Sequence, residues 1–152
     1  QALSAPAMLS NKFDFSSPQK KNIQLAIMEL EKISRRSETE ELVLSVLRTL
    51  SMSLPGQTLL RQNYPNPFNP ETWIPFELSQ SSKVTVVIYN VIGTPIRTIR
   101  IGYMEAGRYV SRSRAVYWDG KTDAGGKVAS GIYFCTLRTQ DYTSTQKMVI
   151  LK

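Results

Sequence analysis

The sequence predicts a mainly β protein, a seven-stranded antiparallel β-sandwich preceded by a short helical hairpin. Apolar residues recur with a helical period before residue 54 and alternate with a period of two from Leu59 onward. The alternating segments are short, turn residues separate them, and no crossover helix of a parallel sheet fits between them. We therefore divide the chain into an extended N-terminal arm (1–15), a helical hairpin (16–54) and a sandwich domain (58–152).

The hairpin is defined by two helix starts and one stop. A Ser N-cap followed by Pro18 begins the first helix. Its apolar stripe comprises Ile23, Ala26, Ile27, Leu30 and Ile33. Ser37 and Glu40 form a capping box for the second helix, which ends before Pro55. The predicted apolar face of that helix comprises Leu42, Val43, Val46, Leu47 and Leu50.

Short alternating segments follow the hairpin. After a first strand near Leu59, the predicted strands cover residues 72–78, 83–89, 95–101, 109–118, 132–138 and 143–151. Pro75 has no N–H to donate, so its strand lies at an edge or contains a bulge. Turns are expected at residues 90–93 and 123–126. This pattern is typical of an antiparallel Greek-key sandwich.

Half of the eight prolines lie between positions 65 and 75. Three of them constrain the backbone of the residue before them, which predicts a stiff, extended crossing between strands. Asn66 and Asn69 can fold their amides back on the main chain as Asx turns. Phe68 is then free to close one end of the sandwich.

This proline-rich segment closely resembles the C-terminal sorting domains of bacterial secreted proteins, the type IX secretion type A class. It is also similar to the Ig-like domain of flagellar hook-capping proteins. The matching blocks are residues 59–78, 87–93, 106–107, 117–120, 129–134 and 147–152, together with Gly125 or Gly126. The resemblance therefore covers the chain from about Leu59 to its end.

The resemblance implies a seven-stranded Ig-like, fibronectin III-like sandwich at the C-terminus of a longer exported protein. It implies that export and attachment machinery of the outer membrane recognises the domain. The residues that carry the structural and recognition motif are Asn63, Tyr64, Pro65, Asn66, Pro67, Phe68, Asn69, Pro70, Trp118, Asp119, Gly120, Gly131, Tyr133 and Lys147. Within this set, Trp118 and Tyr133 are expected to anchor the core, because large aromatic side chains dominate core packing.

The composition argues against an enzyme and against a bound cofactor or metal. The chain has no histidine and one cysteine, Cys135, which alternates with Tyr133 and Leu137 and is expected to be a small buried residue. Asp119 and Asp123 lie in a Gly-rich turn, but the remaining positions do not fit a calcium loop. We expect these two carboxylates to cap backbone N–H groups instead.

The net charge of +7 is concentrated in the second part of the chain, which has twelve basic and six acidic residues from position 55 onward. Arg108, Arg112 and Arg114 share parity on one predicted strand, near several tyrosines. Such a face suits an anionic glycan or single-stranded nucleic acid, of which we favour the glycan. Two alternatives stay open: a solvated face, or a face covered by the acidic residues of the hairpin, Glu31, Glu38, Glu40 and Glu41.

Three functions compete at this point. The first is a sorting and anchoring module of a secreted or cell-surface bacterial protein, and the second is a structural subunit of an extracellular filament, sheath or surface layer. A carbohydrate-binding accessory module is the third. The expected partners are other protein chains, either export machinery or further copies bound head to tail through the arm or the helical hairpin. An arm that folds back on its own sandwich stays open as the alternative. No segment reaches the ~20 apolar residues of a membrane span, and the start at Gln1 suggests a processed chain or a fragment.

Overall fold

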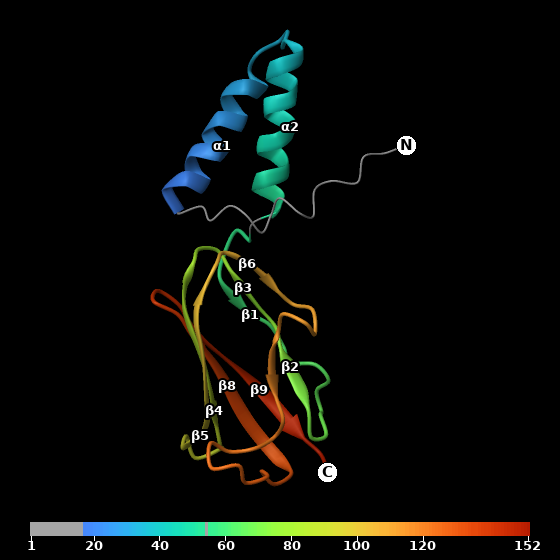
Figure 1. Cartoon of the computed structure of the whole chain (residues 1–152), viewed down its shortest axis with the longest axis vertical. Helices are drawn as coiled ribbons and strands as arrows, with labels where there is room; N and C mark the ends of the chain where they lie inside the picture. The colour runs from blue at the N-terminus through green and yellow to red at the C-terminus, as the bar shows by residue number, and fades with distance from the viewer. Residues whose placement is uncertain (1–16, 54) are drawn as a thin grey trace.

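In the computed structural model, which describes residues 17–53 and 55–152, a helical hairpin stands at one end of a β-sandwich (Figure 1). The hairpin consists of α1 (Ser17–Glu31) and α2 (Glu38–Ser53). Neither of these helices is long and apolar enough to cross a membrane. The predicted arm, residues 1–15, lies outside the described residues.

The predicted capping box at the start of α2 is present. The backbone N–H of Ser37 donates to Glu40 Oε2 at 2.7 Å, and the N–H of Glu40 donates to Ser37 Oγ at 3.3 Å. These hydrogen bonds hold the pKa of the exposed Glu40 carboxyl below its ordinary value. Arg36 and Glu41 form an ion pair at 2.5 Å beside the box, which further fixes the tip of the hairpin.

The predicted apolar face of α2 is wrong in part. Leu44 is the buried residue, with 1% of its surface exposed, whereas Leu42 is 65% and Val46 48% exposed. The helix carries two apolar faces, and only one of them can point toward α1. Leu44 lies on the same helix face as Ser51, which contacts Gln24 of α1 at 3.0 Å.

The strands form two antiparallel layers. The first contains β1 (Leu59–Leu60), β2 (Thr72–Ile74), β3 (Phe76–Leu78), β6 (Gly107–Tyr109) and β7 (Val116–Trp118), paired as β1-β3-β6 and β2-β7. The second contains β4 (Ser82–Tyr89), β5 (Pro95–Met104), β8 (Gly131–Arg138) and β9 (Thr143–Ile150), in the order β5-β4-β8-β9. Mostly β, with two helices before it, the fold class agrees with the prediction.

Two predicted strands are interrupted. Pro75 separates β2 from β3, as expected for a residue without a backbone donor. The strand predicted over residues 109–118 is wrong as a single element, because residues 110–115 leave the sheet between β6 and β7. In that segment the N–H of Ala115 donates to the carbonyl of Ser111 at 2.7 Å, which makes a turn in place of a ladder. The structure describes nine strand segments. Because β2 with β3 and β6 with β7 each correspond to one predicted strand, they account for the seven predicted strands.

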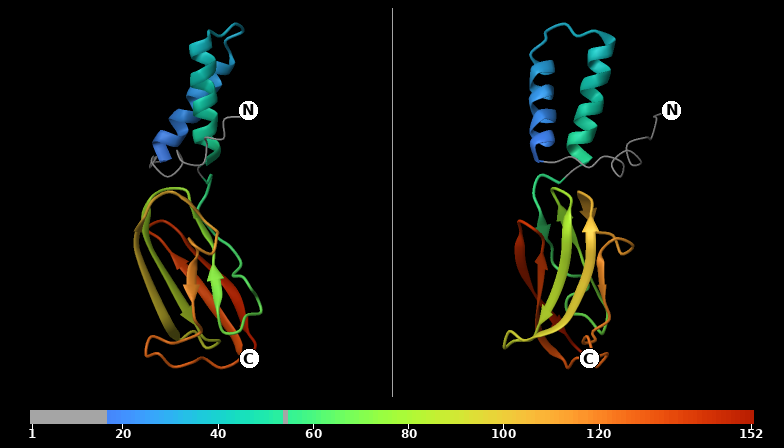
Figure 2. Two further views of the ribbon diagram at one scale, coloured as in Figure 1. Left: turned by 45° about the vertical axis from the view of Figure 1, so that its right-hand side comes forward. Right: turned by 60° about the vertical axis from the view of Figure 1, so that its left-hand side comes forward.

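The inner faces of the two layers share one core. Its largest buried side chains include Trp118, Phe76, Ile88, Leu137 and Met148. Alternation along β4 places Val84, Val86 and Ile88 in this core, as the sequence predicts. The two layers are seen edge-on in Figure 2, with the hairpin beyond one end and the C-terminus at the other. No helix packs extensively on a strand among the described residues.

Candidate recognition site

The proline-rich segment crosses one end of the sandwich and is hydrogen-bonded to the last strand. The N–H of Phe68 donates to the carbonyl of Val149 at 2.9 Å, and the N–H of Leu151 donates to the carbonyl of Phe68 at 3.0 Å. Asn66 Oδ1 accepts the N–H of Val149 at 2.9 Å, so this amide reaches β9 and does not make the expected local Asx turn with its own backbone. The segment and β9 therefore form one unit.

A buried polar cluster holds the start of this segment. Asn63 is buried, and its Nδ2 donates to the carbonyl of Pro65 at 3.1 Å and to Thr72 Oγ1 at 2.9 Å. The hydroxyl of Thr72 donates to the same carbonyl at 3.0 Å. Buried polar groups need partners of this kind, because each unpaired one costs about 1–3 kcal/mol. The cluster fixes the path of the chain while Pro65 and Pro67 stay exposed.

Three aromatic side chains close the end of the core beneath the segment. Phe68 lies 5.6 Å from Trp118 between ring centroids, and Trp118 lies 6.0 Å from Tyr133 in an edge-on arrangement. Trp118 is 1% exposed, and its indole Nε1 donates to the carbonyl of Lys121 at 2.9 Å. The predicted roles of Phe68, Trp118 and Tyr133 in the core are therefore confirmed.

In the turn after Trp118, the carboxylates of Asp119 and Asp123 accept hydrogen bonds from backbone N–H groups. Asp119 Oδ1 accepts the N–H of Lys121 at 3.2 Å, and both carboxylate oxygens of Asp123 accept the N–H of Thr98 at 3.1 and 3.2 Å. Burial alone would raise the pKa of Asp119, but the hydrogen bonds and the charge of Lys121 outweigh it, and the pKa is lowered. Among the described residues, no group of three or more His, Cys, Asp or Glu side chains is placed to hold a metal ion.

Gly120 links this turn to the proline-rich segment. Its φ of +70° suits glycine, and a Cβ there would lie 2.8 Å from the carbonyl oxygen of Pro70. Around this contact the surface is hollowed by about 460 Å³. The lining residues are Asn69, Pro70, Glu71, Tyr117, Asp119, Gly120, Lys121, Lys127 and Lys152. Blocks far apart in the sequence thus meet beside the C-terminus in one hollow, here called the basic hollow because its three lysines outnumber Glu71 and Asp119. One of these lysines, Lys121, pairs with Asp119 at 3.3 Å.

The family comparison agrees with this geometry. Residues 70–142 match the family of FlgD Ig-like domains. The matched part of the sandwich is therefore similar to FlgD Ig-like domains. This confirms the resemblance to the hook-capping family and the Ig-like fold.

The solved structures similar to this chain include secretion and flagellar proteins. Latent dimeric PorU from Porphyromonas gingivalis aligns with 64% of this chain at 15% identity and a TM-score of 0.48. PorZ, an essential surface component of the type IX secretion system of the same bacterium, aligns with 60% at 18% identity and a TM-score of 0.41. The chain spans only 10% of PorU and 11% of PorZ.

FlgD from P. aeruginosa is similar over a larger share of its own length. The two chains are 23% identical, with a TM-score of 0.39, and the match covers 64% of this chain and 72% of that FlgD. No curated protein sequence matches the chain.

The three predicted ligand-binding arginines of the sandwich do not share one strand. Arg108 points outward from β6 and approaches Glu77 at 3.4 Å, whereas Arg112 and Arg114 lie in the segment between β6 and β7. The prediction that Arg112 and Arg114 alternate along one strand with Arg108 is wrong, because residues 110–115 leave the sheet between β6 and β7. No contact joins the three arginines to the hairpin among the described residues.

The predicted cover of these arginines by hairpin carboxylates is also not found. Glu31 pairs with Arg48 at 2.6 Å within the hairpin, and Glu40 and Glu41 are bound at its tip. Figure 1 places this tip far from the sandwich. The carboxylates of Glu31, Glu40 and Glu41 therefore interact with groups of the hairpin itself.

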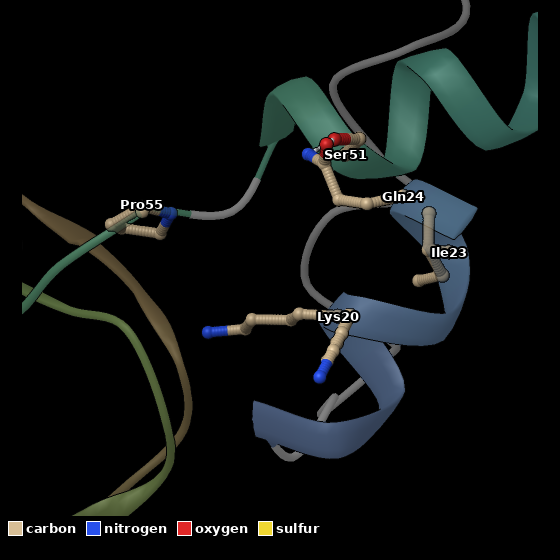
Figure 3. Close-up of a pocket in the computed structure, with 7 residues that line it drawn as sticks. Lys20, Ile23, Gln24, Ser51 and Pro55 are labelled. Atoms are coloured by element: carbon tan, nitrogen blue, oxygen red, sulfur yellow. Dashed lines mark hydrogen bonds between the residues drawn. The ribbon is translucent and has the colours of Figure 1, made fainter. Parts of the chain in front are cut away.

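A second hollow, of about 230 Å³, lies at the base of the hairpin (Figure 3). It is lined by Lys20, Lys21, Ile23, Gln24, Ser51, Pro55 and Gly56. These residues offer two ammonium groups, an amide and a hydroxyl, and the described lining contains no carboxylate or thiol. Such a set can hydrogen-bond a partner but lacks the acid–base pair that hydrolysis would need.

Sequence reasoning missed the outward-facing aromatic row beside the basic hollow. Trp73 on β2 pairs with Tyr117 on β7, and Tyr64 bridges to Trp73 from the proline-rich segment, with 6.3 Å between the Tyr64 and Trp73 ring centroids and 5.7 Å between those of Trp73 and Tyr117. Tyr117 Oη donates to Glu71 Oε1 at 2.9 Å, and this hydrogen bond raises the pKa of the phenol. The signal was present, because Trp73 alternates with the inward residues Thr72 and Ile74. Only the strand pairing brings the three rings together.

Proposed function

We propose that this chain contains a non-enzymatic sorting and anchoring module of a secreted or cell-surface bacterial protein. Its proposed recognition surface is the end of the sandwich where the proline-rich segment, the turn after Trp118 and β9 meet. The observation that carries the proposal is the rigid attachment of an exposed segment: Asn63 and Phe68 are buried, while Pro65, Pro67 and Pro70 remain exposed. A surface held in one conformation loses little entropy when a partner protein binds.

The chemistry of the site supports a binding role over a catalytic one. The sequence contains no histidine. Burial raises the pKa of the Cys135 thiol to about 12, so the thiolate nucleophile is absent near neutral pH. The carboxylates of Asp119 and Asp123 already accept backbone N–H groups. We therefore propose no reaction and no cofactor for this domain.

Export of a reporter tests the sorting proposal. The chain is placed behind a periplasmic reporter enzyme in a bacterium with type IX machinery, and reporter activity is measured at the cell surface and in the medium. We expect transfer of the reporter, and a reduction of at least about tenfold with Lys121→Glu and Lys127→Glu together, because both lysines line the hollow. Arg100→Glu with Lys83→Glu, exposed on the other layer, is the matched control.

Two results would contradict the sorting proposal. The first is a reporter that stays in the periplasm although the sandwich is folded. In the second, the control pair lowers export as much as the hollow pair, which would make total charge the cause. Folding of each variant is checked by fluorescence of the buried Trp118.

A second candidate function is a structural subunit of an extracellular filament, sheath or surface layer. The exposed apolar side chains of the hairpin favour it, because such patches often mark protein contacts. They are Leu25, Met28, Leu42, Val43, Val46 and Met52. Light scattering tests this candidate: Leu42→Glu with Val46→Glu should abolish assembly, whereas Ser45→Glu, which adds a charge to α2 without removing an apolar side chain, should not. A monomeric wild-type chain at high concentration would exclude it.

A further inference from the structure

The segment between β6 and β7 carries two arginines that are each held against an aromatic ring. The guanidinium carbon of Arg112 lies 4.4 Å from the centroid of the Trp73 ring, and that of Arg114 lies 4.6 Å from the centroid of the Tyr109 ring. Such stacking orients the guanidinium plane and leaves its N–H donors at the rim. Two arginines spaced by one residue are thereby positioned before any ligand binds.

Neither arginine is neutralised by the protein. Across residues 17–53 and 55–152, the guanidinium groups of Arg112 and Arg114 make no ion pair and no hydrogen bond, and both side chains are exposed. Arg61 and Arg108 differ from them, because both pair with the buried carboxylate of Glu77. The structure thus separates arginines that support the sheet from arginines whose donors are available.

The surroundings extend this positive surface and add hydroxyl groups. Ser111 and Ser113 alternate with the two arginines, and their hydroxyls are 3.1 Å apart on the exposed side of the segment. Beyond the Trp73 ring lies Tyr117, which also lines the basic hollow with its three lysines. A long polyanion can therefore contact the arginines and the hollow together, and its affinity gains from several weak contacts.

We propose that the Ser111–Arg114 segment is a receptor for an acidic polysaccharide, whose carboxylate or sulfate groups bind the guanidinium groups of Arg112 and Arg114. Planar guanidinium groups pair with such oxyanions in a two-pronged geometry. A polysaccharide fits better than nucleic acid, because stacked bases need free ring faces and the arginines already cover a face of Trp73 and of Tyr109. This binding role is independent of the sorting function.

Titration calorimetry of the full chain tests the receptor. The probes are polygalacturonate, which carries carboxylates, heparin, which also carries sulfates, neutral dextran and an oligothymidylate. We expect binding to one or both acidic polysaccharides and none to dextran. Arg112→Gln with Arg114→Gln should weaken binding by roughly tenfold or more, since both guanidinium–oxyanion contacts are lost. Lys83→Gln with Arg100→Gln removes the same charge from the other layer and should change affinity less than about twofold.

A third variant separates positioning from charge. Trp73→Leu keeps both arginines but removes the ring that holds Arg112, so binding should weaken while the net charge is unchanged. The proposal is overturned if wild-type protein binds neither acidic polysaccharide, or if the control pair weakens binding as much as the arginine pair. Equal affinity for the oligothymidylate, with the same loss in the arginine pair, would also overturn it and indicate a general polyanion surface.

Discussion

Single residues decide whether the two halves of the recognition end fit together. Gly120→Ala would place a methyl group 2.8 Å from the carbonyl oxygen of Pro70, in a backbone conformation that L-residues disfavour. We expect a loss of about 2–4 kcal/mol in the free energy of unfolding, measured with urea. Gly125→Ala is the control: its φ is +84° but nothing lies within 4 Å of the added carbon, so about 1–2 kcal/mol should be lost. Equal losses would show that the contact with Pro70 is unimportant.

Cys135 should make stability depend on pH at the alkaline end. Its pKa is raised from 9.0 to about 12 by burial, so the folded protein holds the thiol proton more tightly than the unfolded chain. The resulting stability is fully present below pH 9 and is lost as the pH rises toward 12. By pH 10.5 we expect wild type to lose about 1–2 kcal/mol more than Cys135→Ala, by urea denaturation at each pH. Parallel curves for the two proteins would contradict the expected burial effect.

The two tryptophans should differ in their contribution to stability. Trp118→Ala removes a buried ring from the aromatic cluster and should cost about 3–5 kcal/mol. Trp73→Ala removes a half-buried ring on the outer face and should cost clearly less. Thermal unfolding followed by circular dichroism measures both, and similar losses would indicate that Trp73 is covered by another part of the chain.

At the scale of elements, α2 depends on its capping box. Ser37→Ala removes the hydroxyl that accepts the N–H of Glu40, and we expect a loss of about 0.5–2 kcal/mol in hairpin stability. Amide hydrogen exchange of α2 measures the loss directly. Ser34→Ala, in the connection between the helices, should leave exchange unchanged, and a similar effect of both variants would argue against a specific cap.

Features that depend on residues close together in the sequence could be predicted, and features that depend on packing between distant segments could not. The capping box, the β4 alternation and the break at Pro75 follow from neighbouring residues. The buried face of α2 could not be predicted, because Leu44 and Leu42 are equally apolar and only packing against α1 distinguishes them. The segment between β6 and β7 was misjudged because Val110 and Val116 continue the alternation through a turn.

The residues of the candidate site also fall into those that could be predicted from the sequence and those that could not. Phe68 and the capping carboxylates could be predicted from proline and turn chemistry, and Trp118 from the family resemblance and its large aromatic ring. The basic hollow and the aromatic row were not, because they join residues from strands that pair only after the sheet has formed. A one-dimensional pattern carries no information on which outward side chains become neighbours across strands.

For the whole molecule, we expect two unfolding transitions. The helices pack on each other and the strands on strands, so little cooperative contact couples the hairpin to the sandwich. Both tryptophans lie in the sandwich, so fluorescence follows the sandwich while circular dichroism at 222 nm is dominated by the helices. In urea, the helical signal should be lost before the fluorescence changes. Coincident curves would show that hairpin and sandwich unfold as one unit.

The hydrogen bonds between the proline-rich segment and β9 have a consequence for the timing of folding during synthesis. Val149 and Asn66, which they join, are 83 positions apart. A ribosome makes residue 66 long before residue 149, so this end of the sandwich stays open until the last strand has emerged. A chain released before residue 143 lacks both β9 and the support of Phe68. This end of the sandwich can therefore close only after β9 has been made, whatever the order in which the other strands pair.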